Sequence, residues 1–332
     1  MRKYQLYIIS GFLAVFVLSA CADKKQDQPN PYGQSEIPFE IHKVKDAPVY
    51  YVIGQSGVPG AANEGMTSNA GFVVTEKGVV VYDALGTPVL GYRLLQAIKK
   101  ITDKPVSMVI AGHYHADHVY GLQAFKEHTK AVIWAEKSAY QYIDSIDSQL
   151  RLDQRRDALF PWVDDTTYLV KPDQTFIGNK TFDMGDTTIE LIHAGPAHSP
   201  DDLIMVVHKY GVVFSGDLIF GGRLPFLGGG DVNTKSWLAG LKYLQSLKPE
   251  PRFVIPGHGT ASDDPVKDIA FTRDYIEFLR TNMAAEIEEL NTFEEAYSHI
   301  DWSKYKQVPT FEAANRRNAY QVFLQVESEV LQ

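Results

Sequence analysis

One short segment, His113-Tyr114-His115-Ala116-Asp117-His118, constrains the fold of this chain more than any other. It places four side chains of metal-binding type within six positions, a density that a random sequence of this composition seldom produces. The apolar run at 105–110 predicts a buried strand before it, and residues 121–125 predict the start of a helix after it. We therefore expect a strand-to-helix loop that binds one metal ion or two adjacent ions, with a metal-free polar loop as the alternative.

The N-terminus resembles the signal of bacterial lipoproteins. Arg2 and Lys3 precede an apolar run, and Leu18-Ser19-Ala20-Cys21 then matches a lipobox at every position. The resemblance implies that residues 1–20 are a signal peptide, that Cys21 is lipidated, and that the protein is exported to the cell envelope, on the periplasmic face of a membrane. An uncleaved anchor is the alternative, but an apolar stretch of about 15 residues is short for the ~20 that span a bilayer.

Composition and charge limit the architecture and the partners of the rest of the chain. Residues 21–38 are polar and rich in Pro, Gly and Gln, which predicts a flexible tether, and residues 39–332 suffice for one large domain or two fused domains. Cys21 is the only cysteine, so the folded domain can have neither an internal disulfide nor a cysteine-ligated metal site. The formal net charge is -9 and there is no basic stripe, so we expect no nucleic-acid partner and no membrane contact beyond the lipid.

Apolar patterns predict strands and helices in alternation. Strands are expected at 48–53, 71–74, 78–83, 105–110, 131–134, 176–177, 181–182, 188–193, 203–207, 212–214 and 252–255. Helices are expected at 88–101, from 121 onward, and at 135–159, 234–247, 264–290 and 311–331. The charged helical region at 135–159 is interpreted as a solvated connection rather than a cover over the site. This order fits an α/β fold in which two sheets pack face to face between outer helices, a four-layer αββα sandwich.

Three later stretches each end a predicted strand in a polar loop with small residues. They are 193–199, 215–218 and 256–259, and the small residues allow tight turns beside a bound metal. Together with the segment 113–118, they resemble in order the motifs of the metallo-β-lactamase superfamily, across about 69–259. The resemblance implies that superfamily's αββα sandwich, here with a C-terminal helical extension, and a site for two metal ions.

The resemblance also implies a role for each matched residue. The first metal would be bound by His113, His115 and His198, the second by Asp117, His118 and His258, and Asp217 would bridge the two. Asp83 matches the strand-end aspartate that supports the metal loop through hydrogen bonds. His193 is left over, and we expect it in a core or supporting role rather than as a ligand.

The predicted ligand set differs from those of several subgroups of the superfamily, and these differences exclude or disfavour the functions of those subgroups. The lack of any cysteine after Cys21 excludes the cysteine-using β-lactamases, and the other two-metal β-lactamases lack a carboxylate like Asp217. Diiron oxidoreductases of the superfamily carry glutamate where His115 stands. A more specific resemblance, in 215–226 and 315–320, is to exported hydrolases found with sulfur-oxidation and quinoprotein systems.

The sequence therefore predicts a zinc-dependent hydrolase with two divalent metal ions, most consistent with Zn²⁺. A zinc-bound hydroxide would attack an ester, thioester or amide of a small molecule, with Asp117 and Asp217 as catalytic residues. Tyr114 and Tyr120 beside the metal loop are candidate substrate contacts. Arg223 could bind a substrate carboxylate in a bidentate pair, or be a structural surface residue. The alternatives are a β-lactamase, a mononuclear-iron enzyme of the persulfide type, and a non-catalytic metal-binding lipoprotein.

Overall fold

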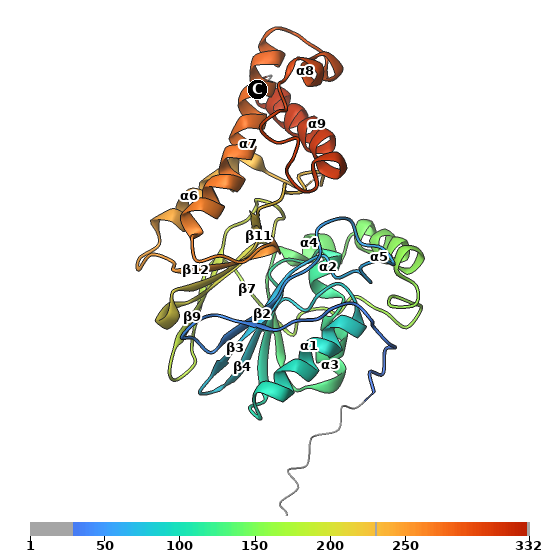
Figure 1. Ribbon diagram of the computed structural model, residues 1–332, viewed down its shortest axis with the longest axis vertical. Coiled ribbons are helices and arrows are strands. Elements are labelled where there is room, and N and C mark those ends of the chain that lie inside the picture. Colours follow the sequence, from blue (N-terminus) through green and yellow to red (C-terminus); the bar gives the residue numbers. More distant parts are fainter. Residues whose placement is uncertain (1–28, 230, 331–332) are drawn as a thin grey trace, which may run out of the picture.

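The computed structural model describes residues 29–229 and 231–330, and it contains two β-sheets with helices outside them (Figure 1). The first sheet has the strand order β1-β2-β3-β4-β5-β6-β7 and the second has the order β12-β11-β10-β9-β8. The strands are β1 His42–Lys43, β2 Val49–Val52, β3 Ala70–Thr75, β4 Gly78–Tyr82, β5 Val106–Ile110, β6 Val132–Glu136, β7 Gln174–Phe176, β8 Lys180–Asp183, β9 Thr188–His193, β10 Leu203–Val207, β11 Val212–Gly221 and β12 Phe253–Gly259. The helices are α1 Pro88–Ile101, α2 Ala116–Val119, α3 Leu122–His128, α4 Ala139–Ile143, α5 Ile146–Leu159, α6 Thr234–Ser246, α7 Pro265–Glu288, α8 Phe293–His299 and α9 Phe311–Val330, with a short 3-10 helix at His208–Tyr210.

The layers follow from the alternation of side chains along the strands. In β3, Phe72 packs in the cluster that contains α1 and α3, whereas its neighbour Val73 packs in the cluster shared by the two sheets. In β10, Ile204 packs with α6 and α7, whereas Met205 faces the first sheet. Each sheet therefore buries one face against the other sheet and one against helices. The predicted four-layer αββα sandwich is confirmed.

Helix α1 supports the loop that follows β5. Its N-terminus is capped by Thr87, whose Oγ1 atom accepts a hydrogen bond from Leu90 N at 3.3 Å, and Pro88 occupies the first helical position. Gly91 lies against Gly121, so closely that an added Cβ would be 2.2 Å from the Gly121 carbonyl oxygen. This contact fixes the end of the 113–121 segment against the helix layer.

Strand β11 is longer than the sequence predicts. The pattern predicts a loop at 215–218, but the strand continues through Asp217 to Gly221 and pairs in parallel with β12. Register shifts around Gly216, which has a φ of 51°, let the two strands stay paired while the backbone changes direction. The strand thereby carries Asp217 directly beside β12.

The turn at Gly178-Asn179 connects different sheets. It lies between two consecutive predicted strands, but β7 pairs in parallel with β6 in the first sheet. Strand β8 pairs antiparallel with β9 in the second sheet. The chain thus crosses from one sheet to the other at this turn, whereas the next turn, through Gly185, forms a hairpin between β8 and β9.

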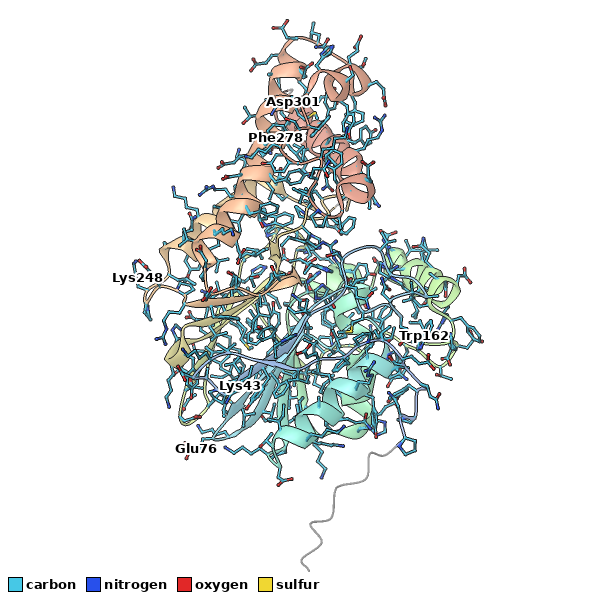
Figure 2. The ribbon with its side chains drawn as sticks, viewed as in Figure 1. Lys43, Glu76, Trp162, Lys248, Phe278 and Asp301 are labelled. Carbon is cyan, nitrogen blue, oxygen red and sulfur yellow. The ribbon has the colours of Figure 1, made fainter. Side chains whose placement is uncertain are left out.

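The expected tether is only partly among the described residues. The signal peptide 1–20, Cys21 and the tether up to residue 28 lie outside them. Beyond that point, Asn30 Nδ2 donates to the Val89 carbonyl at 2.9 Å, and Trp162 Nε1 donates to the Gln34 carbonyl at 2.9 Å (Figure 2 labels Trp162). The last part of the tether therefore packs on the domain, because its polar groups find partners there. Within the described ranges, none of the helices has the length and apolar character needed to cross a bilayer.

Helices α7, α8 and α9 form a helical block at one end of the molecule (Figure 1), marked by Phe278 and Asp301 in Figure 2. Its interior is aromatic, with the Phe278 ring centroid 5.8 Å from that of Trp302 and 5.1 Å from that of Tyr305. The helices predicted at 264–290 and 311–331 correspond to α7 and α9. The short helix α8 between them is an addition to the predicted elements.

Candidate metal centre

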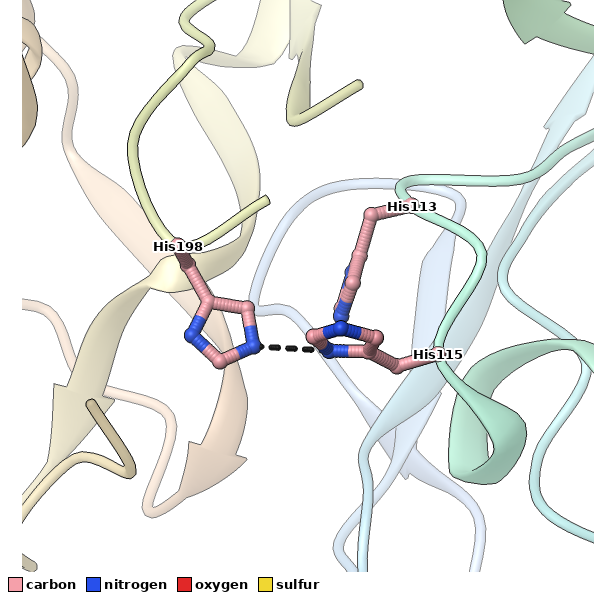
Figure 3. Close-up of side chains that lie close together, drawn as sticks. All are labelled: His113, His115 and His198. Carbon is pink, nitrogen blue, oxygen red and sulfur yellow. Dashed lines mark hydrogen bonds between the residues drawn. The ribbon is translucent and has the colours of Figure 1, made fainter. Parts of the chain in front are cut away.

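The predicted metal ligands come from five segments that the fold brings together. His113 and His115 follow β5, Asp117 and His118 are in α2, His198 lies between β9 and β10, Asp217 is in β11, and His258 is in β12. Their ligand-type atoms form three groups, each within 4.8 Å, which are His113, His115 and His198; His113, His118 and Asp217; and Asp117, His118 and His258. The first and last groups contain the same residues as the two ligand sets expected from the sequence. Figure 3 shows the first group, in which His115 Nδ1 and His198 Nε2 are 2.9 Å apart.

Asp217 lies at the centre of the cluster. Its Oδ2 atom is 3.2 Å from Nε2 of His198 and 3.3 Å from Nε2 of His258. Its Oδ1 atom is 3.3 Å from Nε2 of His118. One carboxylate therefore contacts histidines of both ligand sets, which is the geometry that a bridging ligand requires.

The residues present fit metal ions. Ligands of a tetrahedral zinc site lie about 2.0–2.1 Å from the metal and hence roughly 3.3 Å from one another. Here His115 Nδ1 is 2.9 Å from His198 Nε2, His113 Nε2 is 3.9 Å from Asp217 Oδ2, and all ligand atoms of a group lie within 4.8 Å of one another. Within the described part of the chain, both ring nitrogens of His113 and Nε2 of His118 are buried without a hydrogen-bond partner. Since buried polar atoms are normally satisfied, these nitrogens indicate a metal site.

Burial and mutual repulsion set the protonation of the cluster. Burial and the charge of His118 hold the pKa of His113 well below its usual value, and burial with the charge of His198 lowers the pKa of His115 to about 3. For Asp217, burial raises the pKa, but the charges of His258 and His118 outweigh it and hold the pKa well below the usual value. Neutral imidazoles beside an ionised carboxylate are the protonation states that bind a metal.

His118 differs from the other histidines because two carboxylates face it. Burial lowers its pKa, but Asp217 and Asp83 raise it well above the usual value. Asp83 is fully buried, and its Oδ2 atom lies 2.7 Å from His118 Nδ1 while its Oδ1 atom accepts from Gly112 N at 2.7 Å. Asp83 therefore orients the His118 ring so that Nε2 faces the cluster, the supporting position that the sequence predicts for it.

The segment that supports the second ligand set has no distinctive sequence motif. The Thr67 carbonyl accepts from His258 Nδ1 at 2.7 Å, and Thr67 Oγ1 donates to Asp117 Oδ2 at 3.1 Å. Ser68 Oγ donates to the Asp117 carbonyl at 2.5 Å. The only signal in the sequence is the polar run Thr67-Ser68-Asn69 just before β3, which resembles any polar loop.

His193 lies outside the three ligand groups. Its Nε2 atom is 2.9 Å from the Pro200 carbonyl, and its backbone N donates to Asn179 Oδ1 at 3.1 Å. It thus braces the loop between β9 and β10 that carries His198. This placement agrees with a supporting role rather than ligation.

The tyrosines beside the metal loop do not all face a substrate. Tyr114 is buried, and its hydroxyl donates to the Val170 carbonyl at 3.1 Å, which argues against the predicted substrate contact. Tyr120 is also buried, and burial raises the pKa of its hydroxyl. By contrast, Tyr142 of α4 has its ring 6.1 Å from that of His115. The helical region 135–159 therefore borders the site, and interpreting it only as a solvated connection is wrong.

Arg223 lies beside the second ligand set and is not at the surface. Its side chain is 1% exposed, and Nη1 is 3.5 Å from His258 Nδ1, which already donates to the Thr67 carbonyl. The guanidinium packs over the ring of Phe226, 5.2 Å from the centroid. Nε and Nη2, which form one edge of the guanidinium fork, are buried with no partner among the described residues. The surface alternative for Arg223 is wrong.

Comparison with known proteins identifies the family. The model of the metallo-β-lactamase superfamily matches residues 64–258, more than half of the chain and all of the predicted ligands. The chain belongs to the metallo-β-lactamase superfamily. It is a hydrolase of that superfamily with a His/Asp cluster that can hold metal ions. A metallo-β-lactamase type 2 of Elizabethkingia meningoseptica is 29% identical over 239 residues, which are 70% of this chain and 84% of the relative.

Two solved structures have folds similar to that of this chain. A solved metallo-β-lactamase from Pontibacter korlensis is 21% identical with a TM-score of 0.55, and the match covers 72% of this chain and 99% of that one. The stereoselective inverting sec-alkylsulfatase Pisa1 from Pseudomonas sp. is 16% identical with a TM-score of 0.67, and the match covers 86% of this chain but 50% of that one. These likenesses show the fold.

Proposed function

We propose that this protein is a binuclear metal-dependent hydrolase that holds two divalent ions, most consistent with zinc, and cleaves a small-molecule substrate. The observation that carries the proposal is the position of Asp217, whose Oδ2 atom contacts both His198 and His258. His113, His115 and His198 would hold one ion, and Asp117, His118 and His258 the other. When bound, such ions acidify water and polarise the bond to be cleaved.

Asp117 is suited to orient the attacking water. Burial raises its pKa, but the charges of His118 and His258 outweigh burial and hold the pKa well below the usual value. A carboxylate that is this acidic is a poor proton store but a permanent hydrogen-bond acceptor. Thr67 Oγ1 fixes one of its oxygens, which leaves the carboxylate in a single orientation.

The environment of Arg223 favours a substrate that carries an anionic group. A buried guanidinium without an acceptor is costly, and the planar edge formed by Nε and Nη2 matches a carboxylate or sulfate in a bidentate pair. The relatives whose names state a substrate act on β-lactams and alkyl sulfates, and an alkyl sulfate carries such a group. Among the bonds that could be cleaved, we rank ester, thioester and amide in that order.

The test combines metal quantification with a substrate panel. Purified protein should contain about two transition-metal ions per chain, and hydrolysis of activated esters or thioesters should vanish with a chelator and return with zinc. His118→Ala should reduce kcat/KM by about a hundredfold or more, whereas the matched control His193→Ala should reduce it less than about tenfold.

Two outcomes would count against the proposal, and one would count against the ranking of substrates. One tightly bound iron without zinc would favour the persulfide-type enzyme. Efficient turnover of β-lactams would reverse the ranking of substrates. Protein with two ions per chain that hydrolyses nothing in the panel would favour the non-catalytic metal-binding lipoprotein.

A further inference from the structure

The segment 222–229 joins the metal centre to the C-terminal helical block. It follows β11, which carries Asp217, and it places Arg223 beside His258. Backbone N–H and C=O groups in a buried loop need hydrogen-bond partners, and the residues that supply these partners hold the loop in place.

The partners of this segment come from residues 309–318. Leu224 N donates to the Pro309 carbonyl at 3.1 Å, and Thr310 Oγ1 donates to the Leu224 carbonyl at 3.0 Å. Arg317 Nη2 donates to the Gly228 carbonyl at 2.5 Å. Pro309, Thr310 and Arg317 lie beyond residue 258, where the match to the superfamily model ends.

Asn318 makes the central contact. Its Oδ1 atom accepts from Leu227 N at 2.7 Å, and its Nδ2 atom donates to the Pro225 carbonyl at 2.6 Å. Nδ2 also lies 3.1 Å from the hydroxyl of Tyr275 in α7. The side chain is fully buried, so one amide clamps two backbone positions of the loop and ties them to the helical block.

We propose that Asn318 is a positioning residue that holds the 222–229 segment, and through it the Arg223 guanidinium, in place for the anionic group of the substrate. The proposal rests on the proposed function in one respect, the role of Arg223 toward the substrate. Among the described residues, the hydrogen bonds of the Asn318 side chain go to Leu227, Pro225 and Tyr275 and not to the predicted metal ligands or Arg223, so its effect passes through the loop.

The chain supplies a matched control one turn earlier on the same helix. Asn315 is equally buried, and its Oδ1 atom accepts from the Tyr275 hydroxyl at 2.9 Å while its Nδ2 atom donates to the Tyr297 hydroxyl at 3.1 Å. Both asparagines thus bond to Tyr275, but the hydrogen bonds of Asn315 stay within the helical block. Asn318→Ala and Asn315→Ala should weaken the block alike, and only the first releases the loop.

Two measurements on the full chain separate the variants. In Asn318→Ala, KM for an anionic panel substrate should rise about tenfold while kcat and metal content change less than about twofold. Modification of Arg223 by phenylglyoxal, followed by mass spectrometry, should be slow in the wild type, where the side chain is 1% exposed. It should accelerate about fivefold or more in Asn318→Ala. Asn315→Ala should leave both quantities within about twofold of the wild type.

The modification rate needs no catalysis, so it tests the clamp even if no panel substrate is hydrolysed. Equal effects of Asn315→Ala and Asn318→Ala on Arg223 modification would overturn the proposal, as would a folded Asn318→Ala protein that behaves like the wild type. If Asn318→Ala does not fold, the rate of Arg223 modification in Arg317→Ala tests the proposal instead. The Arg317 side chain is exposed and bonds to Gly228, so this variant should accelerate Arg223 modification in the same direction, and an unchanged rate would overturn the clamp.

Discussion

Asp201 is a buried carboxyl whose ionisation opposes folding. It is 2% exposed, and one of its oxygens accepts from Tyr114 N at 3.0 Å. Burial raises the pKa of this carboxyl to about 7, well above the value in an unfolded chain. Between about pH 4 and pH 7 the native state therefore binds a proton that the unfolded state has lost, and the free energy of unfolding falls as pH rises through this window.

The variant Asp201→Asn should remove this slope. Asparagine keeps an oxygen that can accept from Tyr114 N but carries no charge. The variant should gain stability over the wild type as pH rises from about 4, reaching at most about 4 kcal/mol near pH 7 and above. Urea unfolding of both proteins at several pH values measures the difference. Curves that stay parallel from pH 4 to pH 8 would contradict the assignment.

At single positions, the sequence predicted which metal-binding side chains lie together better than it predicted the surroundings of the expected substrate contacts. The spacing within 113–118 marks four ligand types by local geometry alone, whereas His198, Asp217 and His258 needed the family resemblance because the residues around them form ordinary polar stretches. The hydroxyl of Tyr114 pairs with Val170, far along the chain, and no local pattern reports such a contact. Arg223 could not be placed for the same reason, since its burial depends on Phe226 and on the distant helix α9.

At the level of elements, strands were predictable where side chains alternate between two buried faces. Strands β3, β4 and β10 were predicted within one residue or so, because apolar residues there face either helices or the other sheet. The end of β11 was not predictable, since its extension past Gly216 depends on pairing with β12. Helix α8 carries a local signal that the prediction did not use, the capping box formed by Thr292 and Glu295.

Helix α7 provides much of the outer layer over the second sheet. Ile269, Ile276 and Leu279 are buried in one cluster with Phe220 of β11 and Trp237 of α6. Burial of each such side chain contributes about 1.5–3 kcal/mol, and the net stability of a typical domain is only about 5–15 kcal/mol.

A chain that ends at residue 263 should therefore not fold, even though it contains the whole region matched by the superfamily model. We expect it to be insoluble or to lack a cooperative thermal transition by circular dichroism. The full chain serves as the control. A truncated chain that unfolds cooperatively at the Tm of the full chain would show that α7 is dispensable for the fold.

At the scale of the whole molecule, the layer order was predictable and the packing of residues 29–38 on the domain was not. A chain in which hairpins and helices alternate twice can pack compactly in only a few ways, so the αββα arrangement follows from the order of the elements. The polar composition of 21–38 predicts a free tether, but composition does not report partners. Arg93 of α1 is one such partner. Its Nη1 atom donates to the Ile37 carbonyl at 3.0 Å, which holds the last part of the segment against α1.

A lipid on the N-terminal segment would attach the whole domain to a membrane. We propose that Cys21 is lipidated, as the lipobox Leu18-Ser19-Ala20-Cys21 implies. Asn30 is fixed on the domain by its bond to Val89, and a chain from residue 21 to 30 can span at most about 30 Å, so the lipid would keep the domain within that distance of the bilayer surface. Metabolic labelling with palmitate should mark the wild type but not Cys21→Ser. The variant should keep the metal content of the wild type, and a chain that begins near Phe39 should be soluble and folded, because the predicted ligands all lie beyond that residue. A wild-type protein that is not labelled would contradict lipidation of Cys21. Loss of metal in a folded Cys21→Ser protein would show that the N-terminus contributes to the metal centre.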